Sequence, residues 1–185
     1  AKAAKTLEQL IEVEPANDQN FFALGVAYEE SGRSEEAQKA MRRAIELNGT
    51  NAHALNYLGY TLAEARTNLP EAIALIKRAV ELDPDNGYFI DSLGWAYYRQ
   101  GDLKLARTTL ERAVSFVPTD AVILEHYAII LSETGDLKKA AEVANRALKY
   151  APESDDKEVK GRLEQLSKRL AENMASKNAE ATPQG

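Results

Sequence analysis

The chain of 185 residues contains no cysteine, which excludes disulfide bonds and thiolate metal ligands. It has only two histidines, His53 and His126, and they are too far apart in the sequence to form a metal-binding pair on one helix. Its ten glycines are scattered singly, unlike the glycine-rich loops that cradle phosphates. We therefore expect neither a metal site nor a cofactor.

Long apolar runs and excess positive charge are also missing. The longest apolar stretch, residues 121–131, is interrupted by Glu125 and His126, whereas a membrane-spanning helix needs about 20 apolar residues. Lysine and arginine number 23 against 29 acidic residues, which gives a net charge of -6. Because a nucleic-acid-binding surface is normally basic, this balance predicts no nucleic-acid partner.

No constellation of catalytic residues stands out. Adjacent carboxylates such as Glu29 and Glu30 point in different directions on a helix, so they do not form an acid/base pair. No serine or threonine has a plausible neighbouring base. We therefore expect that the chain is not an enzyme.

What the chain does have is a pattern that recurs about every 34 residues, a period typical of stacked helical repeats. The same dipeptide position holds Leu24-Gly25, Leu58-Gly59, Leu93-Gly94 and Tyr127-Ala128. Small residues recur in step at Ala37, Ala72, Ala106 and Ala140. Each unit of such an array contacts only its neighbours, which predicts one continuous solenoid.

Residues 87–120 show what one unit contains. Apolar residues at helical spacing are followed by Gly101-Asp102, a second apolar helical pattern and Pro118. Asp102 can cap the start of the second helix, and Gly101 suits the left-handed end of the first. The unit is therefore predicted to be helix, tight turn, helix. Gly94 is expected where the two helices approach closely.

The pattern Leu93-Gly94-x-x-Tyr97, with Ala106, Leu110, Ala113 and Pro118, resembles the tetratricopeptide repeat (TPR). The resemblance covers roughly residues 1–154. It implies an all-α fold in which helical pairs stack into a right-handed α-α superhelix, a TPR solenoid.

The repeats also predict the boundaries within the chain. We expect the second helix of a truncated upstream repeat at 1–17, TPR 1 at 18–51, TPR 2 at 52–86, TPR 3 at 87–120, TPR 4 at 121–154, a capping helix at 155–174 and a disordered tail at 175–185. TPR 2 carries one extra residue within 66–70. Under these boundaries the chain is a fragment of a longer array; the alternative is a native protein with an irregular N-terminal helix.

The capping helix is predicted from an apolar stripe beyond the last repeat. Val159, Leu163, Leu166, Leu170 and Met174 are helically spaced, and charged residues fill the positions between them. One side would cover the last repeat and the other would face water. A partner-binding helix would show the same pattern, so that alternative stays open.

The resemblance implies that the first helices of successive repeats line a concave groove. Carried over position by position, the predicted groove residues are Phe22, Val26, Glu29, His53, Asn56, Tyr60, Glu64, Tyr88, Asp91, Trp95, Tyr98, Arg99, Glu125 and Ile129. Tyr60 and Trp95 are expected to be neighbours in a stripe of large apolar residues. Trp95 is either a ligand contact or partly a core residue, and both readings remain open.

An acidic groove with aromatic residues favours a basic or amphipathic protein or peptide. We therefore expect a non-catalytic protein-protein interaction scaffold or adaptor. The alternatives are a self-assembling structural array, joined through an apolar edge at Leu7, Leu10 and Ile11, or the regulatory TPR arm of a larger enzyme. Some TPR domains clamp a chaperone's C-terminal carboxylate with lysine and asparagine, and the corresponding positions here lack that pair.

Residues 83–98 look like bacterial TPR proteins, some of which are lipoproteins that act as adaptors at the cell envelope. The resemblance thus allows a bacterial cell envelope, periplasmic or cytoplasmic location. We expect no direct membrane insertion by this segment.

Overall fold

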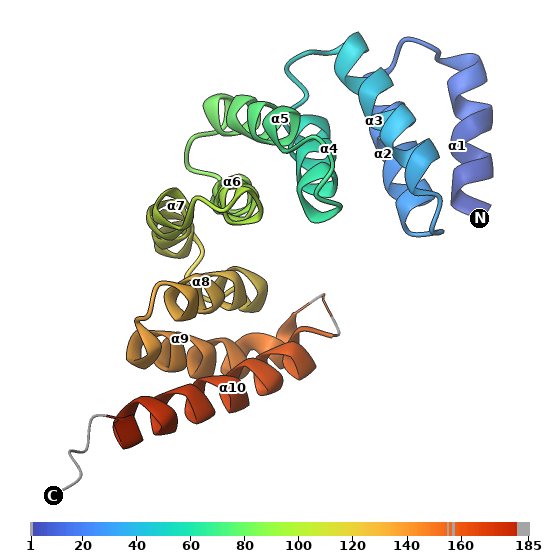
Figure 1. Ribbon diagram of the computed structural model, residues 1–185. Helices are drawn as coiled ribbons and strands as arrows, with labels where there is room; N and C mark the ends of the chain where they lie inside the picture. The colour runs from blue at the N-terminus through green and yellow to red at the C-terminus, as the bar shows by residue number, and fades with distance from the viewer. Residues whose placement is uncertain (1, 155, 157, 181–185) are drawn as a thin grey trace, which may run out of the picture. The chain divides into compact units, whose positions relative to one another are not determined.

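The computed structural model describes residues 2–154, 156 and 158–180, and all the regular structure in these residues is helical (Figure 1). The predicted all-α fold class is therefore confirmed. The chain divides into two compact units, one ending at Pro84 and the other beginning at Asp85.

The first unit consists of five helices packed in sequence order. They are α1 (Lys2–Val13), α2 (Asp18–Glu29), α3 (Ser34–Leu47), α4 (Ala52–Glu64) and α5 (Leu69–Leu82). Two helical hairpins, α2 with α3 and α4 with α5, pack on each other through α3 and α4, and α1 packs on α2. Whether α1 is the second helix of a repeat stays a prediction; the structure shows that it packs on the first helix of the first hairpin.

The second unit repeats the hairpin twice and adds a long helix. Its elements are α6 (Gly87–Gln100), α7 (Leu103–Phe116), α8 (Ala121–Glu133), α9 (Leu137–Tyr150), the short 3-10 helix η1 (Ala151–Glu153) and α10 (Val159–Glu180). The hairpins α6–α7 and α8–α9 pack through α7 and α8, and α6 also contacts α8. The helix α10 packs on α9 and α8, as Figure 1 shows.

A polar side chain marks the start of the first helix in each hairpin. The caps of α2, α4, α6 and α8, whose side chains accept hydrogen bonds from backbone N–H groups of the first helical turn, are Asn17, Asn51, Asn86 and Asp120. Such caps satisfy backbone donors that have no partner within the helix. The asparagine or aspartate between successive repeats thus fixes where each hairpin begins.

Small residues let the two helices of a hairpin approach closely. A Cβ atom added at Gly59 would lie 2.8 Å from the backbone oxygen of Ala72 and 2.5 Å from Cγ1 of Ile76. A Cβ atom at Gly94 would lie 2.6 Å from Cγ of Leu110. The predicted close approach at Gly94 is therefore confirmed.

The turns inside the hairpins use left-handed backbone conformations. Gly101 has φ of 93° and ends α6, as predicted from the Gly-Asp pair. The α4–α5 turn lacks a glycine, and Arg66 and Asn68 take the left-handed conformation there instead, with φ of 52° and 48°. Asn68 precedes α5, and Pro70 lies in its first turn, where a missing N–H is tolerated.

The end of the chain differs from the prediction. The helix α10 begins at Val159 and continues to Glu180, so residues 175–180 are helical although they were predicted to belong to a disordered tail. Ala175, Lys177 and Glu180 are good helix formers, which accounts for the longer helix. Residues 155 and 181–185 lie outside the described residues.

The apolar stripe of α10 is buried against the last hairpin. Val159, Leu163 and Leu170 are fully buried, Leu166 is 5% exposed, and the charged positions between them are exposed. The unused face of α9 and α8 is therefore covered by a helix with one apolar and one polar side.

No helix within the described ranges combines the length and apolarity needed to cross a lipid bilayer. In the same ranges, no group of three or more histidine, aspartate or glutamate side chains is arranged to hold a metal ion.

Candidate protein-binding surfaces

The predicted groove residues lie on the first helices of the hairpins, in two sets. In the first unit α2 and α4 carry Phe22, Val26, Glu29, His53, Asn56, Tyr60 and Glu64. In the second unit α6 and α8 carry Tyr88, Asp91, Trp95, Tyr98, Arg99, Glu125 and Ile129. The expected proximity of Tyr60 and Trp95 joins different units and stays a prediction.

In the first unit, aromatic rings from α2 and α4 meet. The ring of Phe22 lies 6.1 Å from that of His53 and 6.3 Å from that of Tyr57, the latter in an edge-to-face arrangement. Tyr57, which is not among the predicted groove residues, is half-buried. The ring contact nevertheless places Tyr57 in the aromatic group of α2 and α4.

Two buried acceptor atoms on these helices have no hydrogen-bond partner. Oε1 of Glu29 accepts a 3.1 Å bond from Ser34 Oγ, but Oε2 is buried without a donor among the described residues. Oδ1 of Asn56 is likewise buried without a hydrogen-bond donor among the described residues. Burial, followed by the negative charges of Glu29 and Glu30, raises the pKa of Tyr57. The surface of α2 and α4 is thus short of hydrogen-bond donors and locally negative.

In the second unit, Asp91, Trp95 and His126 form a buried cluster that joins α6 to α8. Nδ1 of His126 lies 3.0 Å from both carboxylate oxygens of Asp91. The ring of Trp95 stacks on the imidazole, with centroids 4.0 Å apart and planes 15° apart. Exposure is only 6% for Asp91 and His126 and 8% for Trp95. The cluster therefore has a structural role between two repeats.

Glu125 is also paired within the chain. Its carboxylate, 4% exposed, accepts bonds of 2.8 and 2.6 Å from Nε and Nη2 of Arg162 on α10. Nη2 of Arg162 also donates to Asp156 at 2.8 Å. The hydrogen bond with Glu125 raises the pKa of Arg162, and the one from Arg162 lowers the pKa of Asp156.

These pairs correct the predicted acidic surface in the second unit. Asp91 and Glu125 had been counted as carboxylates available to a basic ligand. Each instead meets a nitrogen-bearing side chain from two helices further along the chain, His126 on α8 or Arg162 on α10. Sequence reasoning missed Arg162 because it lies beyond the last repeat, where the 34-residue register no longer applies.

Three other predicted residues of this unit, Tyr98, Arg99 and Ile129, are half-buried and lie near Trp95 or Glu125. The ring of Tyr98 lies 4.9 Å from that of Trp95, and the guanidinium carbon of Arg99 lies 6.0 Å from the Trp95 ring. Ile129 lines a pocket beside Glu125. A ligand contact for Trp95 remains a prediction, and its packing shows that it also serves the core.

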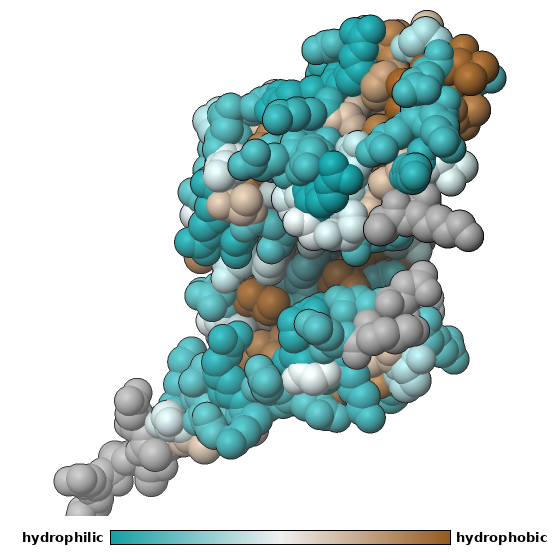
Figure 2. Space-filling model, turned by 90° about the vertical axis from the view of Figure 1, so that its right-hand side faces the viewer, coloured by the Kyte–Doolittle hydropathy of each residue, from teal (hydrophilic) through white to brown (hydrophobic). Residues whose placement is uncertain are grey.

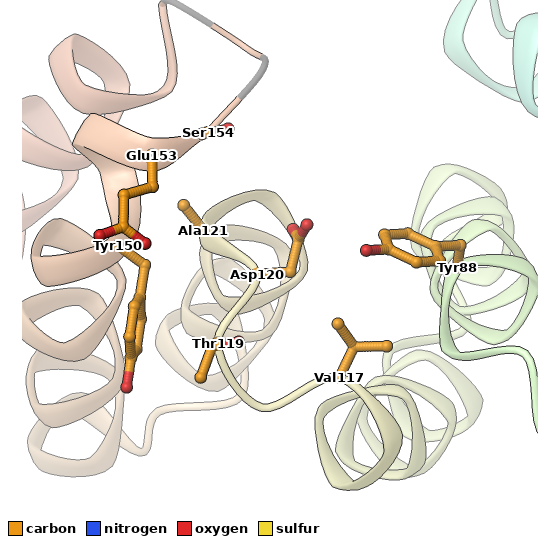
Figure 3. A pocket seen from close by; sticks show the side chains of 8 residues that line it. All are labelled: Tyr88, Val117, Thr119, Asp120, Ala121, Tyr150, Glu153 and Ser154. Atoms are coloured by element: carbon orange, nitrogen blue, oxygen red, sulfur yellow. The ribbon is translucent and has the colours of Figure 1, made fainter.

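Tyr88 belongs to a different pocket, which we call the Tyr88 pocket (Figure 3). It has a volume of about 320 Å³ and is lined by Tyr88, Val117, Thr119, Asp120, Ala121, Tyr150, Glu153 and Ser154. Figure 3 shows the Tyr88 side chain extending from α6 toward Asp120, and Tyr150 and Glu153 on the opposite side. Tyr88 is 57% exposed, so its ring is accessible.

The Tyr88 pocket is acidic and aromatic. One oxygen of Asp120 caps α8, where it accepts bonds from the N–H groups of Val122 and Ile123 at 2.9 and 3.0 Å. The carboxylate of Glu153 has no hydrogen bond or ion pair within the described part of the chain. Sequence reasoning found only Tyr88 here, because the other residues come from loop and helix ends that the groove positions do not include.

Comparison with known proteins adds the family. Three tetratricopeptide repeat models match residues 22–87, 62–123 and 121–154. The TPR repeat-containing protein PA4667 of Pseudomonas aeruginosa is 32% identical over 102 residues, which are 55% of this chain and 17% of that protein. The chain therefore spans less than a fifth of the length of that relative.

Solved structures share the fold at low sequence identity. Pseudomonas aeruginosa pilF is 19% identical with a TM-score of 0.74, over 93% of this chain and 75% of its own. A thermophilic TPR protein of Thermus thermophilus is 17% identical with a TM-score of 0.73, over 88% of each chain. YrrB, a TPR protein with an unusual peptide-binding site, is 19% identical with a TM-score of 0.68, over 94% of this chain and all of its own.

The matched repeats run together from residue 22 to residue 154 and coincide with the four helical hairpins α2–α3, α4–α5, α6–α7 and α8–α9. The chain belongs to the tetratricopeptide repeat family.

Proposed function

We propose that the chain is a non-catalytic protein-binding module that holds a basic or amphipathic segment of a partner against the first helices of its hairpins. The TPR fold commonly mediates protein-protein interaction, and YrrB has a peptide-binding site. Both facts support a binding surface rather than a catalytic site.

The observation that carries the proposal is the composition of the Tyr88 pocket. Two tyrosines and two carboxylates line it, and within the described residues no chain cation pairs with Asp120 or Glu153. A lysine or arginine side chain of a partner would meet the face of an aromatic ring and a carboxylate together. About 320 Å³ is enough space for one such side chain.

The α2–α4 surface supports the same ligand chemistry. A buried acceptor without a donor costs about 1–3 kcal/mol. Oε2 of Glu29 and Oδ1 of Asn56 are such acceptors. An ammonium or guanidinium group carries several donors and a positive charge, so it would satisfy an acceptor and compensate the charge of Glu29. The rings of Phe22 and Tyr57 offer apolar contact on the same helices.

The proposal is tested by selecting binders from a library of random dodecapeptides with amidated C-termini. The wild-type chain should enrich peptides that contain lysine or arginine. The Tyr88→Ala and Glu153→Gln variants should each bind the selected peptides about tenfold more weakly than the wild type does. This loss corresponds to one charge-assisted contact.

Lys104→Ala on α7 serves as the matched control, since Lys104 is exposed and lies on a second helix. Its binding should equal that of the wild type. Selected peptides that bind Tyr88→Ala and Glu153→Gln as tightly as the wild type would remove the Tyr88 pocket from the proposal.

Self-association through α1 is a second candidate, favoured by exposed apolar side chains. Of the predicted edge, Leu10 is 39% exposed, whereas Leu7 and Ile11 are partly buried against the core. Val13, which was not predicted, is 78% exposed. Figure 2 shows apolar surface gathered toward the top of that view, at the height where Figure 1 places α1, α2 and α3. Light scattering at high protein concentration tests this candidate: a dimer that dissociates in Val13→Asp would support it, and a wild-type monomer would exclude it.

A further inference from the structure

We infer that a pocket between α8 and α10 binds an acidic side chain of a partner segment together with an apolar side chain next to it. This inference rests on the proposed function, because it names the chemistry of a second contact made by the same protein-binding module. The pocket, which we call the Arg169 pocket, has a volume of about 350 Å³ and is lined by Glu125, Ile129, Arg162, Gln165, Leu166 and Arg169.

The ion pairs inside the pocket leave one cation uncompensated. The carboxylate of Glu125 is held by two hydrogen bonds from Arg162, so it offers little to a second cation. Arg162 in turn is shared between Glu125 and Asp156. Arg169 is exposed and forms no hydrogen bond or ion pair within the part of the chain that the structure describes. Its guanidinium is therefore available to a ligand.

Arg169 is suited to a carboxylate in particular. The planar guanidinium donates two parallel hydrogen bonds to a carboxylate, an arrangement that is stronger than a bond between neutral groups. Gln165 lies one turn earlier on α10, lines the same pocket and is likewise without a hydrogen-bond partner among the described residues. Its amide supplies a further donor close to the same position.

The rest of the lining is apolar. Ile129 is half-buried on α8, and Leu166 on α10 is 5% exposed. An aliphatic side chain of a partner would lose contact with water against these two residues, which is favourable. The neighbouring acidic residue of the same segment would then reach Arg169. The pocket therefore fits an acidic residue beside an apolar one.

The Arg169 pocket and the Tyr88 pocket, both in the second unit, thus present charges of opposite sign. The Tyr88 pocket presents uncompensated carboxylates, whereas the Arg169 pocket presents an uncompensated guanidinium. The two pockets share no lining residue. Their effects on binding can therefore be measured separately.

The test uses the same random dodecapeptides with amidated C-termini, so that only side chains supply carboxylates. The wild-type chain should select a class of peptides with aspartate or glutamate next to leucine, isoleucine or phenylalanine. Fluorescence anisotropy should show that the Arg169→Glu variant binds these peptides at least about tenfold more weakly than the wild type does. Peptides selected through lysine or arginine should bind Arg169→Glu as they bind the wild type.

Lys168→Glu is the matched control, because it makes the same change of charge at the adjacent residue of α10. Lys168 is exposed and lines none of the pockets described above. Acidic peptides should bind this variant within about twofold of the wild type, since an exposed charge outside a contact has little effect. Unchanged circular dichroism of both variants would show that α10 is intact.

The outcomes separate this inference from the proposed function. Selection of basic peptides only, or equal binding of acidic peptides by wild type and Arg169→Glu, would overturn the Arg169 pocket and leave the proposed function standing. Equal loss of binding in Lys168→Glu would reduce the effect to net charge and also overturn it. Selection of no peptide at all by the wild type would overturn both.

Discussion

At the scale of single residues, two carboxylates determine which charge the second unit presents. Asp91 on α6 and Glu125 on α8 are each about 35 positions from the group that binds them, His126 and Arg162. Each carboxylate thus meets a nitrogen-bearing side chain two helices further along the chain, from α6 to α8 and from α8 to α10. Both carboxylates are buried, so neither belongs to the surface offered to a ligand.

The Glu125–Arg162 pair should respond unequally to removal of its two members. Arg162→Ala leaves a carboxylate that is 4% exposed without its cation, and we expect a loss of about 2–3 kcal/mol in unfolding free energy. Glu125→Gln leaves an arginine whose side chain is 42% exposed and still paired with Asp156, and we expect about 1 kcal/mol. Urea denaturation of both variants measures the difference.

Lys160→Ala is the control for these variants, because the one pair of Lys160 among the described residues is an exposed one with Glu164, at 3.9 Å. It should change the unfolding free energy by less than about 0.5 kcal/mol. A larger loss in Glu125→Gln than in Arg162→Ala would contradict the assignment of Glu125 as the buried member of the pair.

Two glycines of the first unit should also respond differently to the same change. A Cβ atom at Gly59 would lie 2.8 Å from the Ala72 backbone oxygen, which cannot move without separating α4 from α5, so Gly59→Ala should cost about 1–3 kcal/mol. A Cβ atom at Gly49 would lie 3.6 Å from a nitrogen of Arg78, which is ordinary contact. Gly49→Ala should therefore leave the melting temperature almost unchanged, and equal losses in thermal denaturation would disprove the close approach.

The sequence predicted single residues well where one hairpin determines their surroundings. Gly94 was expected at a close approach because its spacing from Leu110 is internal to one repeat. The partners of Asp91 and Glu125 were not predicted, since they depend on how one repeat packs on the next. For Glu125 the partner comes from a helix outside the repeat pattern altogether.

At the scale of elements, α10 shows where periodicity stops being informative. Its buried face was predicted from the spacing of Val159, Leu163, Leu166 and Leu170, and the structure buries all four. The length of α10 was not predicted, because no regularly spaced apolar residue follows Met174. Helix propensity alone extends the helix to Glu180. Repeat boundaries, in contrast, were marked by caps and turns that are local in sequence.

The start of α10 should depend on pH through Asp156. The hydrogen bond from Arg162 holds the pKa of Asp156 below its ordinary value of 3.8. A carboxyl group with a lowered folded-state pKa stabilises the fold above its unfolded pKa, and that contribution is lost as pH falls through the folded pKa. The wild type should therefore have a higher melting temperature than Asp156→Asn at pH 7. The difference between the two melting temperatures should disappear below about pH 3.8.

Asparagine keeps an acceptor for the N–H of Glu158, so this variant isolates the charge of Asp156. Glu172→Gln, on the exposed side of α10, should have the same melting temperature as the wild type at pH 7 and at pH 3. A gap between wild type and Asp156→Asn that persists unchanged at pH 3 would show that the ion pair with Arg162 does not contribute.

At the scale of the whole molecule, each of the two units is built of helical hairpins that pack on one another. The fold followed from the sequence because each repeat carries its own caps, turns and small residues. The binding surface stays a prediction. Two of its predicted residues, Phe22 and His53, are neighbours in the structure. The Tyr88 and Arg169 pockets draw on Glu153, at the end of TPR 4, and on Arg169, on α10, and neither residue is at a predicted groove position.

The most direct test of the proposed function asks which helices a bound peptide touches. A photoreactive phenylalanine analogue, which keeps an aromatic ring in place of Tyr88, is placed either at position 88, on first helix α6, or at position 104, on second helix α7. Each protein is illuminated with a selected basic peptide. We predict a cross-link to the peptide from position 88 and none from position 104. A cross-link from position 104 alone would contradict the proposal that first helices form the binding surface.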